Sequence, residues 1–226
     1  MAIKTRKKTN NILVIGDLHE PFCLDEYLKF NINLQKKYNC NEVIFIGDVI
    51  DGHAWNYHEH NPDGKSPGDE LTWSIKRLQR WYNAFPEATV LFGNHDLLVS
   101  RKAKTAGLSQ RFIREFGDII EAPKTWNFKL DYIKDNVLYT HGDIGNAIKR
   151  ARDSRISTVQ GHLHSQSFIE YSVSIKDKIF GMNVGCGIDR MAYAFEYGKA
   201  LTKKPIIGSG LVLDNGRLPI IELVDL

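Results

Sequence analysis

The chain has 226 residues, of which 42% are hydrophobic and 25% charged, with a formal net charge of +3. These values are typical of a globular protein with one substantial core, exclude a disordered or fibrous chain, and indicate no polyanionic partner by themselves. No stretch approaches the roughly 20 apolar residues of a membrane-spanning helix, so we expect a soluble protein without a membrane partner.

Residues 1–10 are polar and rich in Lys and Arg. No apolar segment with a cleavage site follows, so we predict a flexible basic arm rather than a signal peptide. The three cysteines, Cys23, Cys40 and Cys186, are widely spaced and indicate neither a disulfide framework nor a thiolate metal site. We expect them to be reduced, in a cytoplasmic protein. No linker or repeat interrupts the chain, and we predict a single domain over residues 1–226.

Five strand-like runs recur along the chain, and each leads into polar residues of metal-binding types. The runs and the segments that follow them are Asn11–Ile15 with Gly16–His19, Glu42–Ile46 with Gly47–Asp51, Ala88–Phe92 with Gly93–Asp96, Asn136–Thr140 with His141–Asp143, and Ile156–Gln160 with Gly161–His164. The first four runs are largely β-branched, aliphatic and aromatic, as in strands buried on both faces of a sheet.

Segments with helical periodicity lie between these runs. Leu24–Tyr38 and Leu71–Phe85 have apolar residues every three or four positions, which predicts helices. Alternating strands and helices predict an α/β layered domain. Ligands of open α/β sheets bind beyond the carboxyl ends of the strands, so the five strand ends should converge on one place.

The last third of the chain has a different pattern. Four further segments read as strands: Ser167–Ser174, Lys178–Val184, Ser209–Leu213 and Leu218–Val224. Hairpin turns are expected at Lys176-Asp177 and Asp214–Gly216. We therefore expect a second, mainly antiparallel sheet packed on the first, interrupted by an unassigned stretch over residues 186–206.

The five polar segments resemble the motifs of the calcineurin-like metallophosphoesterase family, written D-x-H, G-D-x-x-D, G-N-H-[DE], H and G-H-x-H. They occur in the family's order as Asp17–His19, Gly47–Asp51, Gly93–Asp96, His141 and Gly161–His164. The resemblance spans residues 11–185 and is specific, because order and context agree as well as residue type. It implies a four-layer αββα sandwich of two mixed β-sheets flanked by helices, with a dimetal site at the strand C-terminal ends.

The resemblance also implies a role for each motif residue. The ligands of one metal ion would be Asp17, His19 and His164. Those of the other would be Asn94, His141 and His162, and Asp48 would bridge the two. His95 would be the catalytic residue that faces the substrate, Asp96 would orient it, and Asp51 would fix the loop after Asp48. This nitrogen and oxygen ligand set favours two divalent transition-metal ions, which could be Mn, Fe, Zn or Ni.

Two such cations would neutralise a phosphate, align its attacking and leaving oxygens, and activate a water as hydroxide. We therefore predict an enzyme, a metal-dependent phosphoester hydrolase. Phosphodiesters, whether nucleotides or nucleic acid, are slightly favoured, because Gly52 and Asp96 stand where the family's protein phosphatases usually have Arg and Glu. The alternatives are a phosphomonoesterase or protein phosphatase, and a non-catalytic scaffold such as the family's retromer subunit.

Other residues are weaker candidates. Arg190 is a candidate for binding the substrate phosphate. The loop Gly52–Asp69 should border the cleft, where Trp55 and Tyr57 could stack on a base or an aromatic leaving group, although packing is the commoner role. Residues 149–155 hold a basic cluster that, if helical, is a cationic face of the kind that is most often only solvated.

Overall fold

The computed structural model describes residues 9–57, 60–143, 145–192, 194 and 203–224, so most of the N-terminal arm and part of the 186–206 stretch lie outside it. A six-stranded sheet has the order β11-β10-β1-β2-β3-β4. Its strands are β1 (Ile12–Ile15), β2 (Glu42–Phe45), β3 (Ala88–Leu91), β4 (Trp126–Lys129), β10 (Gly208–Leu213) and β11 (Leu218–Leu223). Strands β1 to β4 are parallel, and the β10–β11 hairpin adds antiparallel to β1.

A second sheet has five strands in the order β5-β6-β7-β9-β8. These are β5 (Asp131–Lys134), β6 (Val137–Thr140), β7 (Ser157–Gln160), β8 (Phe168–Val173) and β9 (Lys178–Asn183). The inner strands β6, β7 and β9 are parallel, whereas β5 and β8 pair antiparallel at the two edges. Both sheets are therefore mixed, as the resemblance implied.

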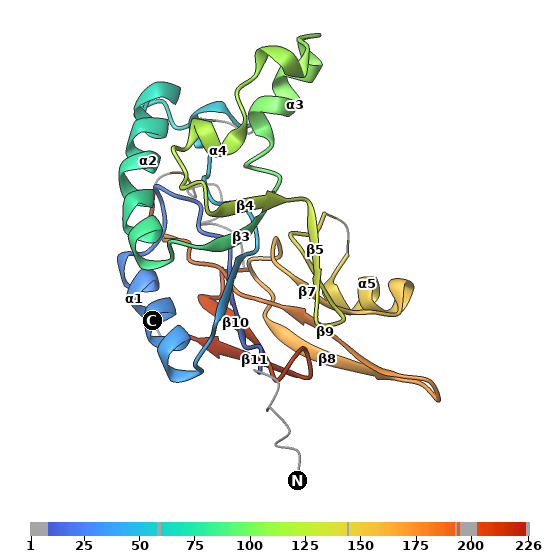
Figure 1. Ribbon diagram of the computed structural model, residues 1–226. Helices are drawn as coiled ribbons and strands as arrows, with labels where there is room; N and C mark the ends of the chain where they lie inside the picture. The colour runs from blue at the N-terminus through green and yellow to red at the C-terminus, as the bar shows by residue number, and fades with distance from the viewer. Residues whose placement is uncertain (1–8, 58–59, 144, 193, 195–202, 225–226) are drawn as a thin grey trace.

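Alternate residues of β1 and β2 point into two different cores, which gives the layered architecture. Ile12 and Val14 pack with residues of the second sheet such as Tyr139 and Met182. Their neighbours in β1 and β2 pack instead with helices α1 (Asp25–Lys37) and α2 (Pro67–Ala84), through residues such as Trp81. Helix α5 (Ala147–Ser154) covers the outer face of the second sheet (Figure 1). The chain is thus a four-layer αββα sandwich.

Local sequence explains where the helices begin. Helix α2 starts four residues before the predicted Leu71, because Ser66 caps it and Pro67 occupies its first turn. The Ser66 Oγ accepts the Asp69 N–H at 3.2 Å and donates to the Asp69 carboxylate at 2.7 Å. Within the described part of the chain, no helix combines the length and apolarity needed to span a bilayer.

Short elements connect the two sheets. They are the 3₁₀ turns η1 (His53–Trp55) and η2 (Gln110–Phe112) and the helices α3 (Leu98–Thr105) and α4 (Phe116–Ile119). Helix α3 and η2 project beyond the sheets, at the top of Figure 1. The sequence pattern did not predict α3, β4 or β5.

The predicted division of strands between the sheets was wrong in two respects. Strands β10 and β11 belong to the first sheet rather than to a separate antiparallel one, and the runs before His141 and Gly161 form β6 and β7 of the second sheet. Apolar patterning shows that a strand is buried but does not identify its neighbour. Ser209 of β10 illustrates this, since it is buried and its Oγ bonds to Tyr27 and Asn31 of α1.

Candidate metal centre

The loops that follow β1, β2, β3, β6 and β7 meet at one edge of the sandwich. The loop after β1 is tied to the loop after β2, because the Leu18 and His19 N–H groups both donate to the Asp48 carbonyl, at 3.1 and 2.9 Å. His19, Asp48 and His162 all have positive φ, at 53°, 46° and 65°. Non-glycine residues are rarely held in this region, and such residues concentrate at functional sites.

One group of side chains at this edge consists of Asp17, His19, Asp48 and His164. The His164 Nε2 lies 3.1 Å from His19 Nε2 and 3.0 Å from Asp17 Oδ2, and His19 Nε2 lies 3.5 Å from Asp48 Oδ2. Atoms that share one ion at about 2.0–2.2 Å lie roughly 3 to 3.5 Å apart. The spacing therefore fits a single bound cation.

A second group adjoins the first through Asp48 and also contains His141 and His162. The His141 Nε2 lies 3.2 Å from Asp48 Oδ2 and 3.1 Å from Asn94 Oδ1. The His141 Nδ1 faces the Ile46 carbonyl at 3.1 Å, so its proton is used there and Nε2 is directed at the group. All seven predicted ligands are thus brought together, and Asp48 is the residue common to both groups.

The carboxylates fit a cation in two further ways. The Asp17 Oδ1 is buried and has no hydrogen-bond partner among the described residues, which is costly unless a cation or another group satisfies it. A Cβ on Gly93 would lie 2.0 Å from Asp48 Oδ1, and one on Gly161 would lie 2.4 Å from Asp17 Oδ1. The motif glycines therefore leave the space that the two carboxylates occupy.

Electrostatics at this edge also favour cations. Burial works to raise the pKa of Asp17 and Asp48, but neighbouring imidazoles, above all His141, outweigh it and hold both pKa values below their usual range. Burial works to lower the pKa of His141, yet Asp48 and Asp17 raise it to about 10. A pair of buried carboxylates that draws a proton onto an imidazole carries excess negative charge, which bound cations would balance.

Asp51 and His95 form the outer part of the site. The Asp51 Oδ1 lies 2.7 Å from His19 Nδ1, so this carboxylate orients a predicted ligand, which is more than the loop-fixing role that was expected of it. The backbone carbonyl of Asp51 accepts the Nδ1–H of His95. Burial opposes protonation of His95, but Asp48 and Asp51 outweigh it and raise its pKa above the usual range.

The prediction that Asp96 orients His95 needs correction. The Asp96 oxygens accept the backbone N–H groups of Val49 at 2.9 Å, Ile50 at 3.3 Å and Gly93 at 2.9 Å, and no hydrogen bond to the His95 ring occurs in the described structure. Asp96 instead clamps the loop after β2 to the loop after β3. The orientation of His95 comes from the Asp51 carbonyl, a backbone group that no side-chain pattern reveals.

Arg190 and the basic cluster of α5 lie away from these groups. Arg190 is exposed and lines a depression formed with residues such as Leu24 and Ile207, so its predicted contact with the substrate phosphate stays a prediction. The cluster of α5 is largely paired with acids. Its ion pairs are Lys149–Asp153, Arg150–Asp143, Arg152–Glu170 and Arg155–Asp177.

An apolar cavity of about 270 Å³ opens beside His95. His95 and Asp96 are its only charged or titratable lining residues among those described. The remaining lining residues are Ile50, Trp55, Pro67, Gly68, Leu71, Val99, Phe116 and Ile119. Trp55 is therefore in the position from which the sequence suggested that it could contact an organic group of a substrate.

Glu70 of α2 supports this region and was missed in the sequence, where it reads as an ordinary acid in a helical first turn. Its side chain is buried, and Oε2 accepts the Ala54 N–H of η1 at 2.9 Å, whereas Oε1 has no partner among the described residues. Burial, with a smaller contribution from Asp51, raises the pKa of Glu70 to about 7. Glu70 thereby holds the turn that carries Trp55.

We expect Glu70→Gln to be more stable than the unaltered chain at pH 8 and to lose this advantage at pH 5. The folded chain holds the Glu70 proton up to about pH 7, whereas the unfolded chain releases it near pH 4.5, so stability falls as pH rises between these values. The full difference is about 3 kcal/mol at most. Urea unfolding at the two pH values measures it, and equal stability of the two proteins at pH 8 would contradict the assignment.

Comparisons with known proteins agree with this architecture. A family model described as calcineurin-like phosphoesterase matches residues 11–181, and no curated protein has a matching sequence. The fold is similar to that of an archaeal phosphodiesterase, with 15% identity and a TM-score of 0.50 over 95% of this chain and 99% of that one. It is also similar to vacuolar protein sorting 29 from Cryptosporidium parvum, with 16% identity and a TM-score of 0.50 over 96% and 92%.

A phosphoesterase from E. coli, YfcE, has 14% identity and a TM-score of 0.42 over 95% of this chain and 100% of that one. At these identities the solved structures show a common fold and nothing about activity. The family model, in contrast, covers about three quarters of the sequence, including all five motifs. The chain therefore belongs to the calcineurin-like phosphoesterase family.

Proposed function

We propose that this chain hydrolyses phosphoesters at the site centred on Asp48, with phosphodiesters favoured over monoesters. The observation that carries the proposal is the pair of side-chain groups that share Asp48, with the His95 ring at their edge, 4.7 Å from the His19 ring. Membership of the phosphoesterase family supports hydrolase chemistry at the level of the reaction type.

In this proposal Asp48 contributes to both metal positions. The ligands of one ion are Asp17, His19 and His164, and those of the other are Asn94, His141 and His162. When bound, two divalent transition-metal ions would neutralise the phosphate and lower the pKa of a water so that it attacks at neutral pH. The mixed nitrogen and oxygen donors favour Mn, Fe, Zn or Ni.

His95 is the residue that would handle the leaving group. Its Nδ1–H is engaged by the Asp51 carbonyl, so Nε2 is the ring atom left to meet the substrate. A protonated Nε2 can stabilise the charge on the phosphate and donate a proton to the departing oxygen. The raised pKa of His95 favours that protonated form.

Two features favour a diester. No Lys or Arg is among the main charges that act on Asp17, Asp48 and His95 in the described structure. Apart from the metals, His95 is thus the cation at hand, and a diester has one negative charge to neutralise where a monoester has up to two. The apolar cavity beside His95 also offers a place for an organic group attached to the phosphate.

The test compares bis-p-nitrophenyl phosphate with p-nitrophenyl phosphate as substrates of the full chain supplied with Mn²⁺. We expect a higher kcat/KM for the diester, and loss of activity when a chelator removes the metal. Metal analysis of the same preparation should approach two ions per chain, in keeping with a dinuclear site.

The other outcomes separate the alternatives. Activity on the monoester alone would indicate a phosphomonoesterase. A chain that binds metal but hydrolyses neither compound, nor a nucleic acid, would support the non-catalytic scaffold. A chain that takes up no metal on addition of Mn²⁺ would contradict the site itself.

A further inference from the structure

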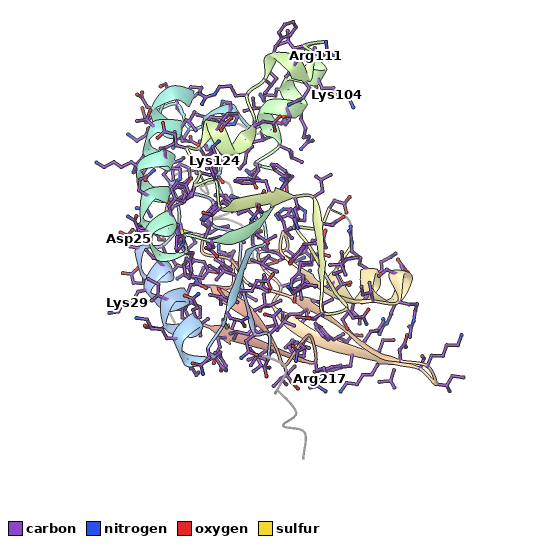
Figure 2. The ribbon with its side chains drawn as sticks, viewed as in Figure 1. Asp25, Lys29, Lys104, Arg111, Lys124 and Arg217 are labelled. Atoms are coloured by element: carbon purple, nitrogen blue, oxygen red, sulfur yellow. The ribbon has the colours of Figure 1, made fainter. Side chains whose placement is uncertain are left out.

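Residues 97–114, here named the α3 projection, follow directly after the Gly93–Asp96 motif. They form α3 and η2 and contain five Lys or Arg residues and no Asp or Glu. The cationic residues are Arg101, Lys102, Lys104, Arg111 and Arg114. Figure 2 labels Lys104 and Arg111 at the outer end of the projection, clear of the two sheets.

The charges of the α3 projection are exposed and not neutralised locally. Arg101, Lys104, Arg111 and Arg114 are exposed, and Lys102 is half-buried. In the described part of the chain, none of the five makes an ion pair with a carboxylate, although Arg114 donates to the backbone carbonyl of Asp118 at 2.8 Å. Helix α5 is different, because the cations of its basic cluster are matched by acids. The α3 projection therefore presents a net positive surface to a partner.

This surface begins at the proposed active site. The Leu98 N–H donates to the His95 carbonyl at 3.1 Å, so α3 starts three residues beyond the proposed catalytic side chain. Val99 of α3 and His95 line the same apolar cavity. Eight helical residues extend about 12 Å. At about 3.4 Å per nucleotide along one DNA strand, that length matches the phosphates of roughly three to four nucleotides.

Aromatic rings accompany the cations. Tyr57, in the loop after Asp51, is 55% exposed, and its ring lies under the Arg101 guanidinium at 5.6 Å and the Lys102 Nζ at 4.7 Å. Phe112 of η2 is 78% exposed. Proteins that bind single strands combine a cationic path for phosphates with exposed rings on which bases stack. In a duplex the bases are already stacked and paired, so these rings would have no equivalent use.

We propose that the α3 projection binds the backbone of a single-stranded nucleic acid and leads it to His95, which makes such strands the substrate class of this enzyme. The assignment of substrate rests on the proposed function, whereas the binding surface does not. Phosphates pair with the exposed Lys and Arg side chains, bases contact Tyr57 and Phe112, and the apolar cavity receives a base or sugar next to the scissile phosphate.

The binding test uses fluorescence anisotropy of a labelled oligo-dT strand with the full chain in EDTA, so that no hydrolysis occurs. The test variant is Lys104→Gln/Arg111→Gln. The matched control is Lys29→Gln/Lys76→Gln, which removes the same charge from exposed positions on α1 and α2. Each lost phosphate contact should lower the slope of log K against log salt by about 0.7, so the test variant should bind about 25-fold more weakly at 0.1 M salt. The control should stay within about twofold of the unaltered chain.

Three results would overturn the inference. They are unchanged binding by the test variant, an equal loss in the control, and duplex DNA binding as tightly as the single strand. Thermal unfolding midpoints of both variants should equal that of the unaltered chain, and the salt slope separates a lost contact from a folding defect. Hydrolysis of bis-p-nitrophenyl phosphate by the unaltered chain is measured in parallel with Mn²⁺. Its absence alongside α3-dependent strand binding would sink the proposed function and leave the binding surface standing.

Discussion

Replacing Asp48 with asparagine should lower kcat/KM for a phosphodiester at least about 1000-fold, which corresponds to about 4 kcal/mol of activation free energy. Asp48 is the one carboxylate that belongs to both side-chain groups. Its Oδ1 accepts the His95 N–H at 2.8 Å, while its Oδ2 faces His141 and His19 at 3.2 and 3.5 Å. An asparagine would keep its oxygen toward the His95 N–H and turn its amide nitrogen, which cannot bind a cation, toward the two histidines.

The fold should survive this change, because asparagine tolerates the left-handed conformation that Asp48 adopts at a φ of 46°. Metal analysis and thermal unfolding therefore accompany the kinetics. We expect metal content to fall from two ions while the unfolding midpoint of the metal-free protein stays close to that of the metal-free unaltered chain. The control is Asp25→Asn on α1, far from the site (Figure 2), which should leave turnover unchanged. Near-normal turnover in Asp48→Asn, or two ions still bound, would remove Asp48 from the shared position.

The local pattern of the sequence was sufficient to predict the positions of the ligands. The five runs ending in Gly or His became β1, β2, β3, β6 and β7, and the side chains after them meet at one edge. This worked because strand ends, glycines and metal-binding side chains are all short-range features. A buried strand that ends in such residues directs them to the same edge whichever sheet it joins.

Long-range pairing was beyond the pattern. Nothing in Gly208–Leu213 distinguishes a strand that pairs with β1 from one that pairs with β9, because the choice depends on contacts such as that of Ser209 with α1. The support of the site was missed for a similar reason. Asp96 and Glu70 act through backbone N–H groups, and the Asp51 carbonyl acts on His95, so side-chain identity along the sequence carries little information about these contacts.

The His95→Ala variant should lose about 100- to 10,000-fold in kcat while it retains both metal ions. His95 is not one of the residues whose nitrogen or oxygen atoms cluster with Asp17 or with Asn94, and its Nδ1 is occupied by the Asp51 carbonyl. The side chain is 19% exposed, so it can reach a substrate. Its removal should therefore affect the chemical step and spare metal binding, which is the opposite of the expectation for Asp48→Asn.

The nature of the leaving group decides what His95 does. If Nε2 donates a proton to the departing oxygen, the loss in His95→Ala should be larger for a substrate with an alkoxide leaving group, such as a dinucleotide, than for bis-p-nitrophenyl phosphate, whose nitrophenolate leaves without a proton. Equal losses on the two substrates would indicate that His95 stabilises phosphate charge instead. Unchanged kcat on both, with metal content intact, would exclude His95 from the reaction and leave the conversion of the phosphoester to the metal ligands alone.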